Sequence, residues 1–519
     1  MKNFTITQED INNKALEVIW RTDGYKLGHV VQFPAGTTKV YSNLTPRSVY
    51  GGVSESQPGA VVMYGMKKFL EDLLQDFDYF FASDINIVGP AYKKRLEEFA
   101  GLENVNIDHI YKLHEIGYLP LEIKAIPEGT IGLIGQPLLT ITNTDDSAYW
   151  LVNYLETWLS AEMWWSITSA TVSWNIRRML EDWVEKTGGD INAIDFNVHD
   201  FSYRGLPGIR SASVAGTGHL LSFTGSDSLS SMDLILNTYP ETTSYIQGGV
   251  PASEHSVMTA NAVDNEGIMD ESPTIKRLLE LYPTGLVSVV SDSYDYWKMV
   301  TETLPKFKEK ITSRDGRYVV RPDSGDPQKI ICGDPDAPEG TPERKGSLEI
   351  LWEIFGGTIN ESGYRELDTH VGLIYGDSMR YDRINAICKN MEEIGFAATN
   401  VVFGIGSYGF QSNTRDTYGF AVKATNVTIN GEQKAIFKDP KTDSGNKKSA
   451  KGLLKLVDTD TGRELLQEIT PEQESEKWDN EIMDTVFYNG EIMNMEDDFQ
   501  KLRDVVKKQT DLWRNGEIK

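Results

Sequence analysis

The sequence predicts an α/β fold, with an irregular TIM-like α/β barrel and a second mixed α+β domain built from both chain ends. The first observation is a pair of short runs rich in β-branched residues, 287–290 and 318–320, each of which continues into charged residues. Between them, residues 294–311 carry apolar side chains at helical spacing. The second observation is that this pattern recurs along the middle of the chain. Because sites in parallel α/β folds form at the carboxyl ends of the strands, the charged residues there become candidates for function.

The composition is that of a large globular protein. With 519 residues, of which 39% are hydrophobic, the chain is long enough for two or three domains with a sizeable core. The formal net charge of −26 argues against nucleic acid or an anionic membrane as a partner, because both attract positive surfaces. Cys332 and Cys388 are the only cysteines, too few for a disulfide framework or a zinc cluster. Since the start lacks an apolar leader and no apolar run reaches about 18 residues, we expect a cytoplasmic protein without a membrane segment.

Residues 1–165 are expected to form a mixed α+β region. Residues 66–77 and 91–99 have helical spacing, whereas 121–125 and 138–142 are typical of strands set off by proline and glycine.

Residues 166–425 are expected to form the barrel domain. Strand-like runs there end in polar residues or glycine, and most are followed by a helical stretch. The runs are 191–198, 221–227, 249–255, 287–292, 318–323, 370–377 and 401–406. Parallel strands in this number, with helices between them, are typical of an α/β barrel.

Residues 426–519 are expected to be rich in β-structure. Asn430-Gly431 and Asn489-Gly490 are hairpin signals between strand-like runs. Because this tail is short, we expect it to pack with residues 1–165 as one discontinuous domain.

Charged residues at the strand ends predict a site for a phosphorylated sugar. Carboxylates can hold sugar hydroxyls, coordinate Mg²⁺ or stabilise a developing positive charge, and arginines and glycine-rich loops bind phosphate oxygens. One such residue alone is more often a solvated strand end or a salt-bridge partner, but the set at one barrel mouth favours a functional site. The set comprises Asp200, Arg204, Asp227, His255, Asp292, Arg321, Asp323, Gly376 and Asp377, with Gly404, Gly406 and Gly409 on the next loop. Arg415 and Lys423, behind that loop in an acidic chain, are further phosphate candidates.

Motifs along almost the whole chain, from Asp23-Gly-Tyr-Lys26 to Phe437-Lys-Asp-Pro440, resemble those of the nicotinamide phosphoribosyltransferase family in its microbial branch. They are His199-Asp-Phe-Ser-Tyr-Arg-Gly205, Gly225-Ser-Asp227, Val250-Pro-Ala-Ser-Glu-His-Ser256, Ser288-Val-Val-Ser-Asp-Ser-Tyr-Asp295, Arg321-Pro-Asp-Ser-Gly325, Gly376-Asp377 and Thr414-Arg-Asp416. The resemblance implies an enzyme of NAD biosynthesis. Such an enzyme joins nicotinamide to 5-phosphoribosyl 1-pyrophosphate (PRPP) with Mg²⁺, giving nicotinamide mononucleotide and pyrophosphate.

The resemblance also implies a nicotinamide site. Phe201 would stack on one face of the pyridine ring and Tyr25 of the partner subunit on the other, which places the active site at a homodimer interface. Asp227 would accept the carboxamide N–H, and Arg321 would lie beside the same ring. A carboxylate in that position repels nicotinate and binds nicotinamide, which favours the amide as the substrate.

The same resemblance assigns the sugar and phosphate contacts. Asp323, Gly376 and Asp377 would hold the ribose hydroxyls, Asp292 would support the same region, and Arg204 would reach the phosphate or base side. The phosphate and pyrophosphate contacts would be Gly406, Ser407, Arg415, Lys438 and, from the partner subunit, Lys423.

His255 corresponds to a histidine that the family phosphorylates from ATP. The resemblance therefore implies ATP as a co-substrate and makes His255, Asp292 and Asp323 the catalytic residues, while the metal ligands stay unassigned. The loop Gly404-Ile-Gly-Ser-Tyr-Gly409 and Ala421 depart from the animal form of the family, which bears on the geometry of phosphate binding and the strength of ATP coupling.

Three alternatives remain at this point. A nicotinate phosphoribosyltransferase shares the architecture, although Asp227 argues against it. A non-catalytic dimeric binding protein could keep the barrel as a scaffold, but it would not need the charged set at the barrel mouth. A sugar-phosphate aldolase or isomerase would want a Schiff-base lysine at a strand end, and no predicted barrel strand ends in one.

Overall fold

The computed structural model describes residues 6–49, 59–265, 268–376, 378–442 and 448–518 of the chain. The chain divides into two compact units, each of which is described by itself. The barrel unit comprises Thr171–Ile235 and Ser244–Ser412, and the α+β unit comprises Met1–Ala170, Leu236–Thr243 and Asn413–Lys519. An α/β barrel together with a second α+β domain built from both chain ends is the fold class that the sequence predicts.

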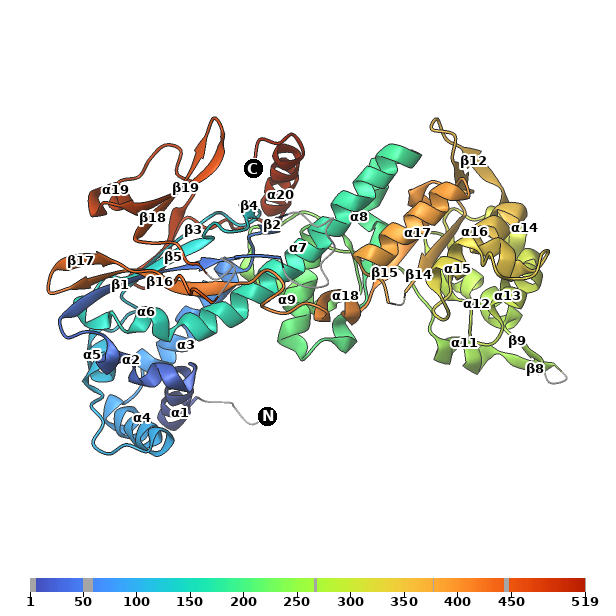
Figure 1. The fold of residues 1–519 in the computed structure, drawn as a ribbon. Coiled ribbons are helices and arrows are strands. Elements are labelled where there is room, and N and C mark those ends of the chain that lie inside the picture. Colours follow the sequence, from blue (N-terminus) through green and yellow to red (C-terminus); the bar gives the residue numbers. More distant parts are fainter. Residues whose placement is uncertain (1–5, 50–58, 266–267, 377, 443–447, 519) are drawn as a thin grey trace. The chain divides into compact units, whose positions relative to one another are not determined.

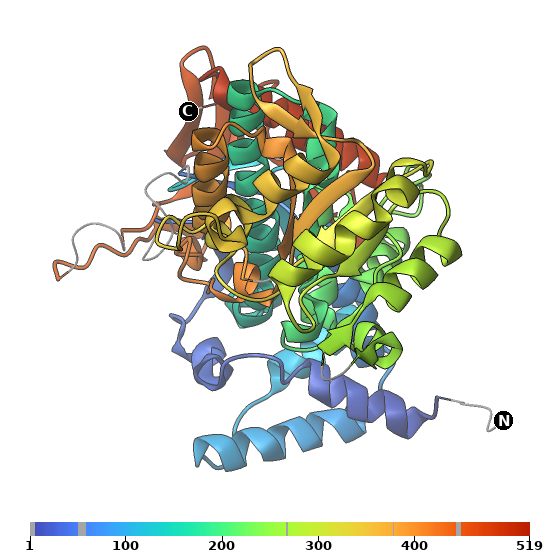
Figure 2. The same ribbon diagram turned by 90° about the vertical axis from the view of Figure 1, so that its right-hand side faces the viewer.

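The barrel unit is built on a six-stranded parallel sheet in the order β10-β11-β14-β15-β6-β7. Figures 1 and 2 draw the ribbon from two sides, and Figure 1 labels β14 and β15 of this sheet. Its strands are β6 (Val198–Asp200), β7 (Gly225–Ser226), β10 (Val287–Val290), β11 (Tyr318–Arg321), β14 (Val371–Tyr375) and β15 (Val401–Ile405). The strands are short, and most of their residues are buried.

The segment 248–253 closes this sheet into an irregular barrel. Parallel bridges join Gly248 to Gly225 of β7 and Ala252 to Ser288 of β10. The backbone N–H of Ser253 donates to the carbonyl of Ser288 at 2.9 Å. Pro251 in this segment has no N–H to donate, which explains why isolated bridges replace the strand expected at 249–255.

Helices connect the barrel strands. They are α8 (Ile194–Asn197), α9 (Ile209–Leu220), α10 (Leu229–Thr238), α11 (His255–Asn261), α12 (Ser272–Leu281), α15 (Pro327–Cys332), α16 (Pro342–Phe355), α17 (Tyr381–Glu393) and α18 (Ser407–Gln411). Two antiparallel hairpins, β8 (Val263–Asn265) with β9 (Ile268–Asp270) and β12 (Gly357–Ile359) with β13 (Arg365–Leu367), are added to this framework.

Three further expectations for the barrel elements are wrong in detail. Residues 191–197 are helical, because the side chain of Asp190 accepts the backbone N–H of Asn192 at 2.9 Å and starts a turn. The run 221–227 contains only the short strand β7, since Leu221 still caps helix α9. The helix expected at 294–311 is broken into short pieces around Pro305, whose ring removes a backbone donor. These pieces are α13 (Tyr296–Lys298), η5 (Met299–Thr303), η6 (Leu304–Phe307) and α14 (Lys308–Thr312).

The α+β unit contains an antiparallel sheet in the order β17-β16-β1-β5-β3-β20-β21. Its strands are β1 (Thr37–Thr45), β3 (Leu121–Ala125), β5 (Leu139–Asn143), β16 (Ala421–Ile429), β17 (Glu432–Ala435), β20 (Asp484–Tyr488) and β21 (Glu491–Ile492). The two expected Asn-Gly turns are confirmed, with φ of 51° at Asn430 and 48° at Asn489.

Helices cover one face of this sheet and form the core with it. Val40, Ile123 and Ile141 of the sheet belong to the same buried cluster as Phe69 and Leu73 of α3. The helices of the unit are α1 (Gln8–Val18), α2 (His29–Gln32), α3 (Met66–Phe81), α4 (Ile85–Ala100), α5 (Asp108–Ile116), α6 (Leu151–Tyr154), the start of α7 (Glu156–Thr187), α19 (Pro471–Ser475) and α20 (Phe499–Arg514). A small hairpin of β2 (Ala60–Val62) and β4 (Ile131–Leu133) completes the unit.

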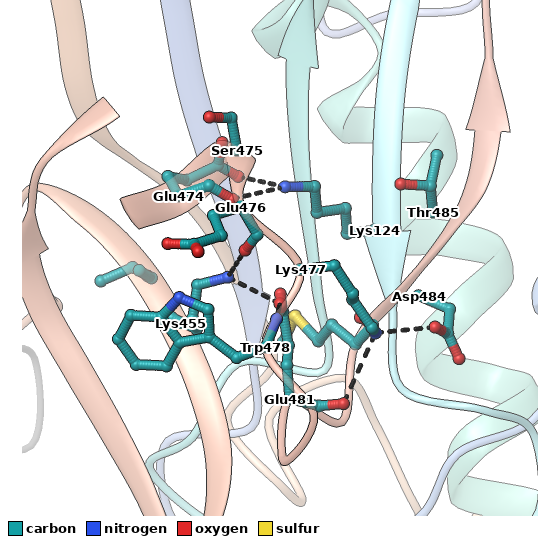
Figure 3. A network of polar contacts seen from close by, with 12 residues as sticks. Lys124, Lys455, Glu474, Ser475, Glu476, Lys477, Trp478, Glu481, Asp484 and Thr485 are labelled. Atoms are coloured by element: carbon teal, nitrogen blue, oxygen red, sulfur yellow. Dashed lines mark hydrogen bonds and ion pairs between the residues drawn. The ribbon is translucent and has the colours of Figure 1, made fainter. Parts of the chain in front are cut away.

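The opposite face of the sheet is polar and carries the hairpin of β18 (Leu453–Thr459) and β19 (Gly462–Ile469) together with α19. Lysines form hydrogen bonds and ion pairs with residues 474–484, which follow this hairpin (Figure 3). Lys455, whose side chain is 1% exposed, donates to Glu481 at 2.6 Å and to the carbonyl of Glu476 at 2.7 Å. Lys124 of β3 donates to the carboxylate of Glu474 at 2.6 Å.

No helix among the described residues combines the length and the apolar character that crossing a bilayer requires.

Candidate active site

Every strand of the barrel sheet delivers a predicted site residue at or just beyond its carboxyl end. Phe201 follows β6, Asp227 follows β7, Asp292 follows β10, Arg321 ends β11 with Asp323 after it, Gly376 follows β14 and Gly406 follows β15. Because all six strands are parallel, these residues share one rim of the barrel.

A small cavity opens at this rim, inside the barrel. Its apolar wall includes Phe196, Phe201, Val250, Leu286, Ile374 and Val402. Its polar lining consists of His199, Asp227, Ser288 and Arg321. A mostly apolar pocket with a few convergent polar groups is the usual form of a site for a small aromatic ligand.

Two hydrogen-bond donors in this cavity have no partner among the described residues. Arg321 uses one terminal nitrogen to donate to the carbonyl of Ser253 at 2.7 Å, but its Nε is buried and unpaired. The hydroxyl of Ser288 is also buried and unpaired. Since a buried donor without an acceptor is costly, both groups are suited to an oxygen atom of a ligand. Sequence reasoning missed Ser288, because it lies inside an otherwise ordinary strand.

The cavity also presents one acceptor. The carboxylate of Asp227 is half exposed, and its Oδ1 accepts a hydrogen bond from Nε2 of the buried His199 at 3.0 Å. The rings of His199 and Phe201 lie 4.7 Å apart between centroids.

Glycines make room for the ring of Phe201. A Cβ on Gly404 would lie 2.7 Å from Cδ2 of that ring and 2.7 Å from the Cα of Gly376, closer than real Cβ atoms come. The backbone N–H of Phe201 donates to the carbonyl of Ile405 at 2.9 Å, which fixes the residue against β15. Gly404 is therefore required by the position of Phe201, whereas a Cβ on Gly376 would lie 2.9 Å from Oδ1 of Asp323.

The side chain of Asp292 holds the loop that follows β11. Its Oδ2 accepts the backbone N–H of Asp323 at 2.9 Å and the hydroxyl of Ser324 at 2.6 Å. Its Oδ1 is buried and has no hydrogen-bond partner within the described part of the chain. Nε2 of His255 lies 3.8 Å from this oxygen.

His255 begins helix α11 and remains accessible, with half of its side chain exposed. Its Nδ1 lies 3.3 Å from the hydroxyl of Ser293. Burial raises the pKa of the neighbouring Glu271, against a hydrogen bond from Ser293 that lowers it. The imidazole is therefore flanked by two acidic side chains and a hydroxyl.

The remaining predicted residues of the barrel unit lie on loops. Arg204 is exposed on the 3₁₀ turn Tyr203–Gly205, and Gly406 precedes Ser407 at the start of α18. Gly205 leaves the space that the hydroxymethyl group of Ser407 occupies. Asp377 lies outside the described residues.

Four predicted residues belong to the α+β unit. Tyr25, on the 3₁₀ turn Gly24–Gly28, has 64% of its surface exposed. Lys423 lies on β16, whereas Arg415 and Lys438 are exposed on loops.

Lys423 lies in a cluster of cations. Burial lowers its pKa, the cations Arg47, Lys438 and Lys26 lower it further, and Glu156 raises it. Lys26 is paired with Glu156 at 2.5 Å. Cations held near one another in this way are suited to an anion with several charges. Sequence reasoning missed Arg47 and Lys26, which lie almost four hundred residues before Lys423 and give no local signal.

The described residues contain no group of three or more His, Cys, Asp or Glu side chains arranged to hold a metal ion. Asp292 nevertheless accepts the backbone N–H of Asp323, so both residues lie at the same rim, and Oδ1 of Asp292 is buried without a partner among the described residues. Mg²⁺ usually takes one or two carboxylates from the protein and its other oxygens from water and substrate phosphates. The donor set therefore fits Mg²⁺ held jointly with a phosphorylated substrate.

Comparison with known proteins identifies the family. The profile described as "Nicotinamide phosphoribosyltransferase, N-terminal domain" matches residues 17–123, and that described as "Nicotinate phosphoribosyltransferase (NAPRTase) family" matches residues 196–491. A nicotinamide phosphoribosyltransferase of Acinetobacter baylyi is 44% identical over 480 residues, covering 91% of this chain and 93% of the relative. The chain belongs to the nicotinamide phosphoribosyltransferase family. It is accordingly an enzyme of the pentosyltransferase class, as the sequence predicts.

Further comparisons agree with this assignment. A nicotinamide phosphoribosyltransferase of Xanthomonas campestris is 32% identical, covering 92% of this chain and 95% of the relative. The fold is shared with a nicotinate-nucleotide pyrophosphorylase from Pyrococcus furiosus at a TM-score of 0.55 and 16% identity, with 99% of both chains covered. It is also shared with human nicotinic acid phosphoribosyltransferase at a TM-score of 0.52 and 14% identity, covering 94% of this chain and 93% of that one.

Proposed function

We propose that this protein transfers the 5-phosphoribosyl group of PRPP to nicotinamide, giving nicotinamide mononucleotide and pyrophosphate for NAD biosynthesis. The observation that carries the proposal is the polarity of the barrel cavity. A carboxamide has N–H donors and a carbonyl acceptor, and the cavity offers the Asp227 carboxylate together with the unpaired donors of Arg321 and Ser288. Phe201 supplies the aromatic wall against which a pyridine ring stacks.

The reaction would be a displacement at C1 of the ribose. The lone pair of the pyridine nitrogen forms the new C–N bond, and the C–O bond to pyrophosphate breaks with its electron pair leaving on oxygen. Asp292 and Asp323 lie at the rim where positive charge develops on the sugar, so their carboxylates stabilise the oxocarbenium-like transition state. Gly376 and Asp377 would complete the ribose contacts.

Phosphate and pyrophosphate would be held by Arg204, Gly406, Ser407, Arg415 and Lys438, together with Lys423 of the partner subunit. Asp292 and Asp323 would hold Mg²⁺, which would supply positive charge to the pyrophosphate leaving group. A homodimer would contribute Tyr25 of the partner subunit to the ring, and the exposure of Tyr25 supports this role. ATP would phosphorylate His255, whose exposed imidazole is available for it.

The first experiment is product formation from PRPP and Mg²⁺ with nicotinamide or nicotinate as the base, each with and without ATP. Nicotinamide mononucleotide formed in preference to nicotinate mononucleotide would support the proposal, and stimulation by ATP that is lost in His255→Ala would support the phosphohistidine. No product from either base would contradict the enzyme proposal and favour a non-catalytic binding protein.

The assignment of Asp227 has its own test. Asp227→Asn should raise the KM for nicotinamide, because an amide can no longer accept the substrate N–H as strongly, and should improve the relative use of nicotinate. An unchanged KM for nicotinamide would contradict the role of Asp227.

Shared active sites can be tested by mixing two inactive variants. If each site combines residues of two subunits, Tyr25→Ala removes a residue that one subunit contributes, and Asp292→Ala removes a residue that the other subunit contributes. Co-refolded mixtures should regain activity through sites that combine the intact halves. Mixtures that stay inactive, although size-exclusion chromatography shows dimers, would contradict the shared site.

Nicotinate is the second candidate for the base. It is favoured by the profile matched at residues 196–491, whose description names nicotinate phosphoribosyltransferase. The carboxylate of Asp227 opposes it, since two carboxylates in one small cavity repel each other.

A further inference from the structure

His199 is placed to control the carboxylate that lines the cavity. It lies in the middle of β6, its side chain is only 4% exposed, and its Nε2 lies 3.0 Å from Oδ1 of Asp227. A carboxylate only accepts hydrogen bonds, so the Nε2–H of His199 is the donor in this contact.

The surrounding backbone holds both residues in place. The N–H of Asp227 donates to the carbonyl of Asp200 at 3.0 Å, which fixes the main chain of Asp227 but leaves its half-exposed side chain free to rotate. Register pairs His199 with Gly225, and a Cβ on Gly225 would lie 2.8 Å from Nδ1 of the imidazole. Glycine at 225 therefore leaves room for the imidazole beside β7, where its Nε2 contacts Asp227.

We propose that His199 is a positioning residue for base recognition. By donating to Oδ1 it fixes one rotamer of Asp227, so that Oδ2 faces the cavity and accepts the carboxamide N–H. This inference rests on the proposed function, because it takes nicotinamide as the ligand of the cavity. The carboxylate of Asp227 is then already oriented before nicotinamide binds, which lowers the entropic cost of ordering this side chain on binding.

His199 also preserves the selectivity of the site. The Nε2–H of His199 satisfies one oxygen of Asp227 and leaves the other oxygen as an acceptor for the base. The anionic carboxylate repels a second carboxylate, so that the amide is accepted and the acid is rejected. Loss of the donor would let the Asp227 side chain turn toward solvent, and the discrimination between the two bases would fall.

The test compares His199→Gln with His199→Leu. Glutamine keeps an N–H donor at a reach similar to that of Nε2, whereas leucine has a similar volume and no donor. We expect His199→Leu to raise the KM for nicotinamide by about tenfold, the scale of one lost hydrogen bond to a charged group. The kcat at saturating nicotinamide and the KM for PRPP should change little, the preference for nicotinamide over nicotinate should fall, and His199→Gln should stay close to the wild type.

A double-mutant cycle separates this role from a structural one. If His199 acts through Asp227, His199→Leu should add almost no further rise in KM in an Asp227→Asn background. Equal loss in the leucine and glutamine variants, or additive losses in the double variant, would overturn the inference. Melting curves identify a variant that fails to fold, in which case His199→Asn, whose shorter amide falls short of Oδ1, replaces the leucine variant in the same comparison.

The same experiments distinguish failure of the proposed function from failure of this inference. A wild-type enzyme that makes no mononucleotide from nicotinamide would refute the proposed function, and the inference with it. An active wild type in which the leucine variant keeps its KM and its base preference would refute the inference alone.

Discussion

A Cβ on Gly404 would lie 2.7 Å from Cδ2 of Phe201, so the aromatic wall of the cavity depends on a residue without a side chain. Gly404→Ala should move the ring, lower the free energy of unfolding by about 1–3 kcal/mol and raise the KM for nicotinamide. Denaturant unfolding and steady-state kinetics measure the two effects. Gly406→Ala is the matched control for stability, since a Cβ there meets nothing within 4 Å and the backbone φ is −84°. Equal stability of the two variants would contradict the contact with Phe201.

Lys423 should give pyrophosphate binding a dependence on pH. Burial and the cations Arg47, Lys438 and Lys26 lower the pKa of its ammonium group, and a bound anion would raise that pKa again. Binding should therefore take up protons, and the affinity for pyrophosphate should fall as the pH rises through the lowered pKa. Titration calorimetry of pyrophosphate over the alkaline range measures this. The variant Lys423→Arg, whose guanidinium stays charged, should lose the dependence. Retention of the same pH profile in that variant would assign the effect to another group.

His109 should make the α+β unit sensitive to acid. Its ring packs edge-on against Trp150 at 4.7 Å between centroids, and burial lowers its pKa from 6.5 to about 4. Between these values the unfolded chain binds a proton that the folded chain does not, so stability should fall as the pH drops from 6.5 toward 4. Melting temperatures of wild type and His109→Gln across this range provide the measurement. The loss should be smaller in the variant, and parallel curves for the two proteins would contradict the assignment.

Lys455 and Glu481 form a buried ion pair under the β18–β19 hairpin, with side chains 1% and 6% exposed (Figure 3). Lys455→Met should lower the free energy of unfolding by about 3–5 kcal/mol, because it leaves a buried carboxylate without its partner. Lys451→Met is the control, since its pair with Glu468 is exposed and should cost at most about 1 kcal/mol. Adding Glu481→Gln to Lys455→Met should restore part of the loss. Chemical denaturation that shows equal effects for Lys455 and Lys451 would be inconsistent with the buried pair.

The sequence predicts the barrel best where strands are runs of β-branched residues. The strands that begin at Val287, Tyr318, Val371 and Val401 are found where they are expected. Residues 191–197 also read as a strand but are helical, because a capping aspartate decides the local structure more than the apolar pattern does. The run 249–255 is expected as a strand, but segment 248–253 closes the barrel through isolated bridges, because Pro251 has no N–H to donate to a ladder.

The residues of the candidate site also fall into those that the sequence predicts and those that it does not. Residues beyond strand ends, such as Asp227, Asp292 and Asp323, can be recognised in the sequence because a charged side chain is rarely found inside a buried strand. Ser288 and His199 lie within strands, where a polar side chain in a β-run gives no sign of whether it faces the cavity. The grouping of Arg47 with Lys423 arises from the pairing of β1 with β16, which brings together segments far apart in the chain.

The pairing of β1 with β16 joins Thr37–Thr45 to Ala421–Ile429, and the barrel unit lies between them in sequence. During synthesis β1 can pair with β5 early, but its other neighbour β16 is made only after most of the chain, whereas every segment of the barrel unit precedes residue 413. Ribosome-bound chains must keep the apolar face of β1 protected throughout that interval, and the order of emergence favours the barrel as the first unit to complete its fold.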